Sequence, residues 1–592
     1  MIYSKDIIGE ISFLSEPRSI EDKGLGNVLI LLVILQCLDS GELLITDTVK
    51  VNDLVEKESI GPQAVKFKKG DEINLSQLIR LHLWKMFPDT SLLLAKLYRE
   101  KTKKSAQERL NKFVQDHSLS ENCCKNISGR KRRNAPQAYT INDLKVIANE
   151  WTKLPKKTFE YISQNQCVYN GKLFERKDLK LGTELFPYRI SWGENRITFH
   201  ENEVFIILEA KNQYELDKQL LMMVSNQPAR KETLDNLIAR RGNSTHFDRN
   251  EMTIVITGDT YLGEFYSKRR LARGKWDPLK EKGYNYAFEK ANHFLKEADF
   301  SIINLEAVLV EDLEKSPLMR EKRFVLGGRA TQTMKTLKEN SVDLVTLATN
   351  HIGDYGQDGV YSTLTTLKKH KMPWIGSGFD EEDALCPYRI TTQEQDVFIF
   401  NGYWFISRHH LKYEMYALGK HLGGNCISEY FLQAIRETKQ KFPDAKVIVI
   451  CHWSQDYKHI LKYQYHTATE LVTAGADLII GHGSHAIQTV GKMLSKDVLY
   501  GLGNFVFSSE GEFELHPKSL PYGMVVKLNV SGKQMNATLH FLQEQNHRTK
   551  YQPQEINSED FEIILGAWGA KRIQSLGWKI EKEKRTISKK LW

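Results

Sequence analysis

The sequence predicts an α/β protein whose C-terminal half is a layered domain, and three observations lead to this fold class. Short β-branched runs alternate with helical segments from residue 252 onward. Polar side chains come directly after these runs, as expected where chemistry lies at the carboxyl edge of a sheet. The chain has 592 residues, and single cores stop growing near about 250–300 residues, so at least two domains are expected.

The domain boundary is predicted near residues 226–250, where the chain is polar and charged and contains a Pro and a Gly-Asn-Ser run. We expect an N-terminal domain at 1–225, a linker at 226–250, the layered domain at 251–545 and a C-terminal extension at 546–592.

The elements of the layered domain follow in order. The run MTIVITGD is a buried strand that delivers Asp259 at its tip. The helical segments YNYAFEKANHFLKEA, ATQTMKTLKENS and GVYSTLTTLKKHK precede the strands FSIINLE, VDLVTLATNH and PWIGSG. Then come KVIVICHW, a helix around HTATELVTAG, and the strands ADLIIGHGSH and VLYGLGNFVF. The runs YGMVVKLNV and QMNATLHFLQ are predicted to form a strand pair.

Composition narrows the class of protein. Hydrophobic residues make up 41% and charged residues 27%, which is ordinary for a globular protein, and the net charge of +9 is mild for this length. The basic run at 129–134 lacks aromatic neighbours, which favours a solvated loop over nucleic-acid binding. The apolar stretch at 29–37 is too short for a transmembrane segment and predicts a buried helix. Seven cysteines without a CxxC, and an N-terminus unlike a secretory signal, predict a cytoplasmic protein.

The polar residues at the predicted strand ends are the types that bind divalent metals. Oxygen and imidazole ligands from several loops can hold a metal pair that clamps a phosphoryl or acyl oxygen. One histidine after a strand is usually structural, but successive strand ends that all carry such residues indicate a site. They are Asp259, Asn304, Glu306, Asn350, His351, His452, His482 and His485.

These segments carry a resemblance to a known family. GDTYLGE, INLEAVL, LATNHIGDYGQDGVYSTLTTLKKHKMPWIGSG, CHWSQDY, AGADLIIGHGSHAIQ and YGLGNFVF resemble, in order and spacing, the signature segments of the poly-γ-glutamate capsule protein family known as CapA. The resemblance covers residues of about 250–508. It implies the fold of calcineurin-like metallophosphoesterases, in which helices flank a sandwich of sheets around a metal centre.

The same resemblance implies residue roles. Asp259 and His485 would ligate a first metal, Glu306 would bridge, and Asn350, His452 and His482 would ligate a second. His351 would be the general acid. The expected cofactors are one or two divalent ions, Mn or Fe/Zn.

Some residues keep two interpretations. Asn304 and Asn504 are candidates for substrate binding, but they could equally bond a loop or a turn. Asp354 and Asp358 are expected to cap the following helix. Two departures weaken the catalytic prediction. Tyr261 stands where classical phosphoesterases have a histidine ligand, and Gly483 stands where the capsule family often has another histidine.

The order of segments in residues 1–225 resembles the D-alanyl-D-alanine carboxypeptidases, which share the α+β serine β-lactamase fold; the alternative is an unrelated helical domain. These enzymes carry the catalytic motifs Ser-x-x-Lys, Ser-x-Asn and Lys-Thr-Gly. In this chain Gly24 to Asn27 stand in place of the first motif and Met86 to Pro88 in place of the second, and no Lys-Thr-Gly follows. The resemblance therefore implies a degenerate domain, a pseudoenzyme that lacks its nucleophile.

Together these patterns favour a metal-dependent hydrolase in poly-γ-glutamate or related capsule and cell-envelope polymer biosynthesis. It would act on an anionic peptide or phosphorylated substrate, with a polymer synthetase as a partner. The alternative is a non-catalytic accessory protein that contains metal and binds polyglutamate or the synthetase. An active DD-peptidase is disfavoured because its nucleophile is missing.

Overall fold

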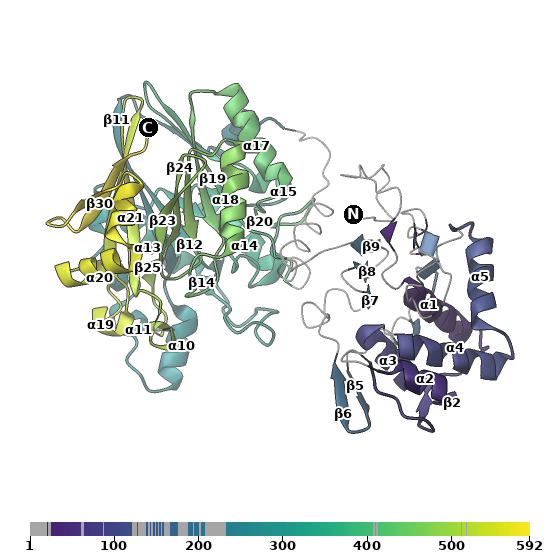
Figure 1. Ribbon diagram of the computed structural model, residues 1–592. Coiled ribbons are helices and arrows are strands. Elements are labelled where there is room, and N and C mark those ends of the chain that lie inside the picture. Colours follow the sequence, from purple (N-terminus) through teal and green to yellow (C-terminus); the bar gives the residue numbers. More distant parts are fainter. Residues whose placement is uncertain are drawn as a thin grey trace. The chain divides into compact units, whose positions relative to one another are not determined.

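The computed structural model describes residues 232–592 except 407, 408, 410–412, 511 and 517, and residues 25–120 except 61–63 and 87. Elsewhere it describes residues 20–21 and short segments between 127 and 207. The chain divides into two compact units, Met1–Met223 and Val224–Trp592, and each is considered by itself (Figure 1).

The first unit is built around the apolar helix α1 (Leu25–Asp39). Nearly all of its residues are buried, which confirms a core helix in place of a membrane span. Further helices, among them α2 (Asp53–Glu58), and several short strand elements surround it. They include α3 (Leu75–Lys85), α4 (Pro88–Thr102), α5 (Ala106–Asp116), the β2–β3 pair (Thr48–Lys50, Glu72–Asn74), the β5–β6 hairpin (Gln166–Tyr169, Lys172–Glu175) and the β7–β8–β9 sheet (Tyr188–Trp192, Asn195–His200, Glu203–Ile207).

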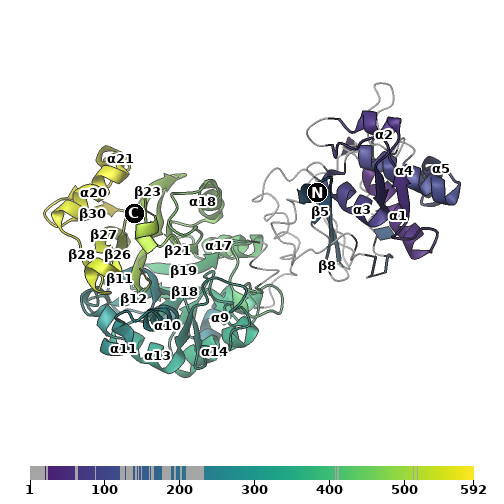
Figure 2. The same cartoon turned by 90° about the horizontal axis from the view of Figure 1, so that it is seen from below.

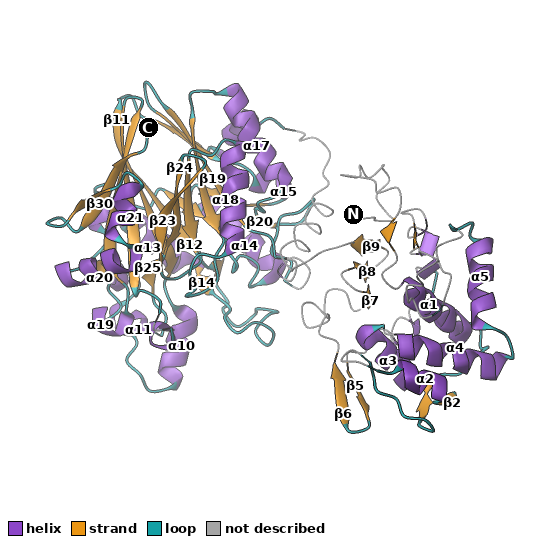
Figure 3. Cartoon of the chain, viewed as in Figure 1, coloured by secondary structure: helices purple, strands orange, loops and turns teal. Residues whose placement is uncertain are grey.

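The second unit contains two large sheets, which Figure 3 shows with helices around them. The seven-stranded sheet has the order β10-β18-β19-β21-β22-β24-β23. Its strands are β10 (Ser244–His246), β18 (Tyr388–Thr391), β19 (Asp396–Tyr403), β21 (Lys446–His452), β22 (Leu478–His482), β24 (Lys496–Leu502) and β23 (Ile487–Met493).

The ten-stranded sheet has the order β16-β15-β12-β11-β26-β27-β30-β29, with β25 beside β11 and β28 beside β27. Its strands are β16 (Trp374–Ile375), β15 (Leu344–Thr346), β12 (Phe300–Leu305), β11 (Glu251–Tyr261), β26 (Tyr522–Ser531), β27 (Gln534–Gln543), β30 (Thr586–Lys590), β29 (Lys579–Glu581), β25 (Asn504–Phe507) and β28 (Gln554–Glu555). The β26–β27 pair confirms the predicted strand pair.

The two sheets share one core, as a sandwich requires. Ile254 and Ile302 of one sheet pack in the same buried cluster as Ile399, Ile448 and Ile480 of the other. The outer face of the seven-stranded sheet is covered by α17 (Glu429–Lys441) and α18 (Lys462–Ala474), which lie side by side in Figure 1. Figure 2 shows α13 (Ala330–Glu339) and α14 (Gly356–Lys369) together at another edge of the unit.

Both ends of this unit are more structured than a linker and an extension. Within 226–250, α9 (Leu234–Arg241) buries Leu237 and Ile238, and β10 pairs with β18. Beyond residue 545, α20 (Ser558–Trp568), α21 (Ala570–Ser575) and the β29–β30 hairpin follow. Trp578 and Ile587 from this segment belong to the buried core between the sheets. No helix among the described residues has the length and apolarity to cross a membrane.

Candidate metal centre

The strand register brings the predicted ligands together at one edge of the sandwich. Asp259 at the end of β11 lies beside Asn304 of β12 on one side and Asn504 of β25 on the other. In the second sheet, His452 of β21 is paired with His482 of β22. Because these pairings are parallel, the carboxyl ends of the strands meet at a common edge.

The Glu306 carboxylate forms the middle of this cluster. It follows β12 and is fully buried. Its Oε1 atom lies 3.7 Å from His351 Nε2, 3.9 Å from His452 Nε2 and 3.8 Å from His485 Nε2. These distances are longer than hydrogen bonds. Asp259, Glu306 and His485 each offer one ligand atom within 4.8 Å of the others.

Five polar atoms of the cluster are buried without a hydrogen-bond partner. They are both carboxylate oxygens of Glu306, Asn350 Oδ1, and the Nδ1 atoms of His452 and His482. Each such atom costs about 1–3 kcal/mol if it stays unpaired in the folded protein. A divalent cation would satisfy carboxylate, amide and imidazole donors together, so the residues present fit a metal.

Asp259 is held by its neighbours in one orientation. Its Oδ1 accepts a hydrogen bond from Asn304 Nδ2 at 2.8 Å, and Oδ2 accepts one from the Gly483 backbone at 3.1 Å. Thr346 in turn bonds Asn304 Oδ1 at 2.8 Å. A side chain at Gly258 would lie 2.1 Å from the Gly503 carbonyl, so glycine lets the β25 backbone come close enough to bond the Asp259 amide.

Each of the paired histidines has a buried Nδ1 atom without a hydrogen-bond partner. His482 donates from Nε2 to the Thr257 carbonyl at 2.8 Å, which leaves its Nδ1 lone pair available. Burial lowers the pKa of His482, and burial and the neighbouring histidines lower the pKa of His452 far below its ordinary value. Both imidazoles are therefore neutral at pH 7, which is the state that binds metal. A side chain at Gly483 would lie 2.6 Å from His452 Nε2, so a histidine does not fit there.

His485 is oriented by Asn504, which is buried beside it. The Asn504 Oδ1 atom accepts a hydrogen bond from His485 Nδ1 at 2.9 Å, so Nε2 faces Glu306. The His485 backbone is left-handed, with φ of 52°, a strained conformation for a residue with a Cβ. Burial disfavours the imidazolium, but Glu306, Asp456 and Asp259 outweigh it and raise the pKa to about 9. Burial raises the pKa of Glu306 well above its ordinary value, and the adjacent charge of Asp259 adds to this.

His351 belongs to a polar triad that the sequence analysis did not identify. Its Nδ1 donates to Asp354 Oδ2 at 2.6 Å, and Lys322 bonds Asp354 from the other side. Lys322 also donates to the Asn350 carbonyl at 2.7 Å. Burial would raise the pKa of Asp354, but His351 and Lys322 hold it below its ordinary value. Burial, assisted by Lys322, lowers the pKa of His351.

The prediction that Asp354 caps α14 is wrong. The N-cap residue of this helix is Tyr355, and no side chain caps it. Asp354 instead bonds His351, Lys322 and the Leu326 amide. Asp358 lies exposed in the first helical turn, where its charge favours the helix dipole. The His-x-x-Asp spacing was the available signal for the pair. Lys322 lies in a loop and had no signal.

Tyr261 takes no part in the cluster. Its hydroxyl donates to the Gly327 carbonyl at 3.1 Å and accepts from the Phe265 amide at 2.7 Å, and the ring is buried. The position of the missing histidine thus supplies no metal ligand.

In the first unit, the positions compared with a peptidase site are occupied by a closed polar network. Asn27, in the first turn of α1, donates to the Met86 carbonyl at 2.6 Å and accepts from Ser91 at 2.7 Å. His82 bonds the Asn27 carbonyl and Thr90, each at 2.8 Å. Gly24 and Phe87 lie outside the described residues.

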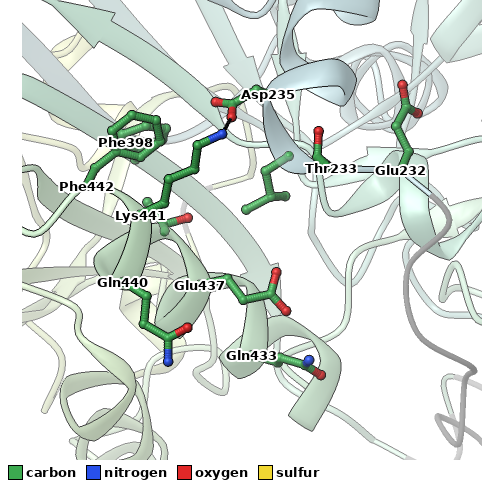
Figure 4. Close-up of a pocket in the computed structure, with 11 residues that line it drawn as sticks. Glu232, Thr233, Asp235, Phe398, Gln433, Glu437, Gln440, Lys441 and Phe442 are labelled. Carbon is green, nitrogen blue, oxygen red and sulfur yellow. Dashed lines mark hydrogen bonds and ion pairs between the residues drawn. The ribbon is translucent and has the colours of Figure 1, made fainter.

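A separate pocket of about 580 Å³ lies between α9 and α17 (Figure 4). Its lining includes Leu234, Phe398, Glu437 and Phe442, and Lys441 reaches Asp235 across it. It shares no residue with the metal cluster and presents no group of metal ligands among its lining residues.

Comparisons with known proteins match the part of the chain that carries this cluster. Residues 253–509 match the family model described as bacterial capsule synthesis protein PGA_cap. The capsule biosynthesis protein CapA of Bacillus anthracis is 26% identical over 275 residues, 44% of this chain and 61% of that protein. The PGA biosynthesis protein CapA of Bacillus subtilis is 26% identical over 259 residues, 43% of this chain and 63% of that protein. A probable polyglutamine synthesis accessory protein of Mycobacterium tuberculosis is 24% identical over 221 residues, 36% of this chain and 57% of that protein.

The chain thus spans about three-fifths of the length of these relatives. Among solved structures, penicillin-binding protein 6B from Escherichia coli aligns with a TM-score of 0.28 and 14% identity over 34% of this chain and 67% of that chain. The carboxypeptidase DacD from Francisella tularensis aligns with a TM-score of 0.31 and 11% identity, over 37% of this chain and 67% of that chain. Residues 253–509, which carry the cluster of candidate metal ligands, are thus similar to the bacterial capsule synthesis protein PGA_cap family.

Proposed function

We propose that the second unit is a metal-dependent hydrolase that acts on an anionic peptide or phosphorylated substrate. The observation that carries the proposal is the Glu306 carboxylate, which is buried without a hydrogen-bond donor and faces three imidazole nitrogens at 3.7–3.9 Å. A buried carboxylate in this setting needs a cation.

In this proposal the ligands divide into two groups. Asp259, Glu306 and His485 would hold a first ion, and Asn350, His452 and His482 would hold a second near Glu306. The donor set suits Mn, Fe or Zn. A bound divalent ion supplies Lewis-acid polarisation of a phosphoryl or acyl oxygen and a hydroxide at neutral pH.

The remaining side chains orient the reacting groups. His351 would donate a proton to the leaving group from Nε2 as the imidazolium, the form that Asp354 favours by accepting the Nδ1 proton and fixing the ring. Asn304 and Asn504 are fully buried and bond Asp259 and His485. We therefore assign them positioning roles and replace the earlier expectation that they contact substrate.

The relatives supply the biological setting of the proposal. Two are named for capsule or PGA biosynthesis, and one for polyglutamine synthesis. By analogy this chain would act on poly-γ-glutamate, a related envelope polymer or a precursor, next to a synthetase. The five described cysteines are buried free thiols, which suits a cytoplasmic location.

One observation favours a second candidate, an accessory protein that binds metal without turnover. Tyr261 replaces a ligand and its hydroxyl is engaged elsewhere. One ion would then be held tightly and the other weakly.

For the first unit we propose a non-acylating role, because Asn27 occupies the position of the missing lysine in a closed network. Covalent labelling by penicillin would overturn this assignment.

The two candidates separate in one experiment. The purified full-length protein is assayed with Mn²⁺ against generic phosphomonoesters, phosphodiesters and glutamate oligomers, in parallel with His351→Ala. The hydrolase proposal predicts Mn²⁺-stimulated turnover that His351→Ala lowers by about 10²–10⁴-fold while bound metal stays unchanged. Bound metal without turnover on any of these substrates in the wild type would favour the accessory protein.

A further inference from the structure

Two arginines share an aromatic surface beside the metal centre. The Arg269 guanidinium lies 4.2 Å from the Phe265 ring centroid and 5.7 Å from that of Phe324, and the Arg323 guanidinium lies 4.8 Å from Phe324. The two rings are in edge contact at 6.0 Å. Arg269 also donates to the Arg323 carbonyl at 3.4 Å, which ties α10 (Glu264–Ala272) to the loop that carries Arg323.

Neither guanidinium has a carboxylate partner among the residues that the structure describes. Their neighbours differ in this respect. Arg270 is buried against Asp277 at 3.0 Å, and Lys268 bonds Glu314. Arg323 is exposed and Arg269 is half-buried, so both can reach an incoming anion. Stacking on the rings restricts both side chains, which reduces the entropy lost when they bind a ligand.

The arginine pair is connected to the centre along two routes. Lys322, next to Arg323 in sequence, lies 3.3 Å from His351 Nδ1. A row of aromatic rings also connects Phe324, which stacks on both arginines, to His485 of the cluster. Phe324 contacts Tyr266 at 6.2 Å, Tyr266 contacts Phe507 at 6.5 Å, and Phe507 contacts His485 at 4.8 Å.

We propose that Arg269 and Arg323 form a subsite that binds carboxylates of an acidic polypeptide whose reacting bond lies at the metal centre. The proposal rests on the proposed function and names the part of the substrate that is recognised away from the reacting bond. Guanidinium groups bind carboxylates through two parallel hydrogen bonds, and two separate groups match carboxylates on separate residues of one chain.

An acidic polypeptide fits the pair better than a polyphosphate. Phosphate sites are commonly built on helix N-termini, whose amides and dipole favour a dianion. Arg269 lies in the last turn of α10, at the opposite end of the helix dipole. A polyphosphate carries a charge on every phosphate, more closely spaced than the carboxylates of a polypeptide, so that dipole penalises it more.

The test measures binding separately from chemistry. Equilibrium binding of a γ-linked glutamate oligomer, a glutamine oligomer of the same length and inorganic polyphosphate is measured on the full chain by fluorescence anisotropy. The same titrations are made on the double variant Arg269→Gln/Arg323→Gln. A second double variant, Lys571→Gln/Arg585→Gln, removes one exposed and one half-buried cation of the C-terminal segment and matches the change in net charge. Metal content is determined for every sample.

The subsite predicts that the wild type binds the glutamate oligomer but not the glutamine oligomer. The arginine variant should lose at least tenfold in affinity with its metal retained, while the charge-matched variant loses less than twofold. Equal losses in the two double variants would show a general charge effect and overturn the proposal. Absence of glutamate-oligomer binding, or a preference for polyphosphate, would also overturn it. If the proposed function is wrong, the result differs: the protein contains no metal and shows no turnover, but it still binds the oligomer.

Discussion

Asp354 illustrates how one buried carboxylate organises a reacting group. It bonds His351 and Lys322 together and is fully buried. Asp354→Asn keeps the shape but removes the charge that fixes the His351 ring. We predict a loss of turnover of about 10- to 100-fold and a loss of about 1–3 kcal/mol in the free energy of unfolding, with bound metal unchanged.

Asp358→Asn is the matched control, because this aspartate is exposed four residues later on α14. It should change turnover less than twofold and the free energy of unfolding by at most about 0.5 kcal/mol. Steady-state kinetics and urea denaturation of both variants decide the point. Equal effects in the two would contradict the role given to Asp354.

Asn504 is predicted to act on metal affinity through His485. Asn504→Leu removes the acceptor for His485 Nδ1 and should weaken metal binding by about 10- to 100-fold. Asn504→Asp keeps an acceptor and should retain affinity. Equilibrium dialysis with Mn²⁺ measures both, with the exposed Asn536→Leu as a control. Weakened binding in the control, or unchanged binding in Asn504→Leu, would rule out this contribution.

At the residue scale the strand pattern indicated that Asp259, Glu306 and His485 come together, but not which atoms they use. Asp259, Glu306 and His485 come together because polar residues follow successive apolar strands, a pattern visible in the sequence. The bond from Lys322 to Asp354 spans a loop without periodicity, so nothing in the sequence indicated it. The Asn504 amide has several chemically acceptable partners, and only the strand register selects His485.

At the element scale, Asp477 ties the strands of the seven-stranded sheet to a helix. It accepts hydrogen bonds from the Val447 amide at 3.0 Å, from Lys439 of α17 at 3.1 Å and from Lys496 of β24 at 2.7 Å. Burial alone would raise its pKa, but the Lys496 and Val447 bonds and the lysine charges lower it.

A carboxyl whose pKa is lowered on folding stabilises the protein above the pKa of the unfolded chain, about 3.9. That stabilisation is lost as the pH falls through the lower folded value. Asp477→Asn should therefore cost roughly 1–3 kcal/mol at pH 7, and the difference from the wild type should shrink toward pH 3. Denaturation at both pH values tests this. The exposed Asp444→Asn should show neither effect, and a pH-independent difference for Asp477→Asn would contradict the argument.

Where the apolar periodicity is strong, the strands of the second unit were predictable, as at β11, β12 and the β26–β27 pair. The segment YNYAFEKANHFLKEA is one exception. The structure divides it into a 3₁₀ turn, η2 (Tyr286–Phe288), and the short helix α12 (His293–Lys296). Asn285 donates to Glu339, the last residue of α13, and Asn292 donates to Asn340, which follows that helix. These side-chain bonds favour i→i+3 turns over a continuous helix.

At the scale of the whole chain, the extent of the second unit was the hardest feature to predict. Strand β10 pairs with β18 across about 140 residues, and β30 pairs with β27 from the end of the chain. Neither pairing leaves a local signal, because a short polar strand looks like a loop. The segments 226–250 and 546–592 therefore read as a linker and an extension, although both contribute to the packed core.

Metal binding should stabilise one of the two units selectively. An ion present at 100 times its dissociation constant stabilises the folded state by about 2.7 kcal/mol. We predict two unfolding transitions in calorimetry. EDTA should lower the midpoint temperature of only one of them, by several degrees. In Asp259→Ala the midpoint temperature of that transition should be low even without EDTA, and EDTA should not change it. Two transitions that shift together in the wild type would contradict a metal confined to the second unit.

The most direct test of the central claim is the metal content of the purified full-length protein, compared with Glu306→Gln. This substitution keeps the size of the side chain but removes the charge at the centre of the cluster. We predict at least one equivalent of Mn, Fe or Zn per wild-type chain and less than a tenth of that amount in the variant, with the fold unchanged by circular dichroism. A wild type that binds no metal after incubation with these ions, or a variant that binds as much as the wild type, would contradict it.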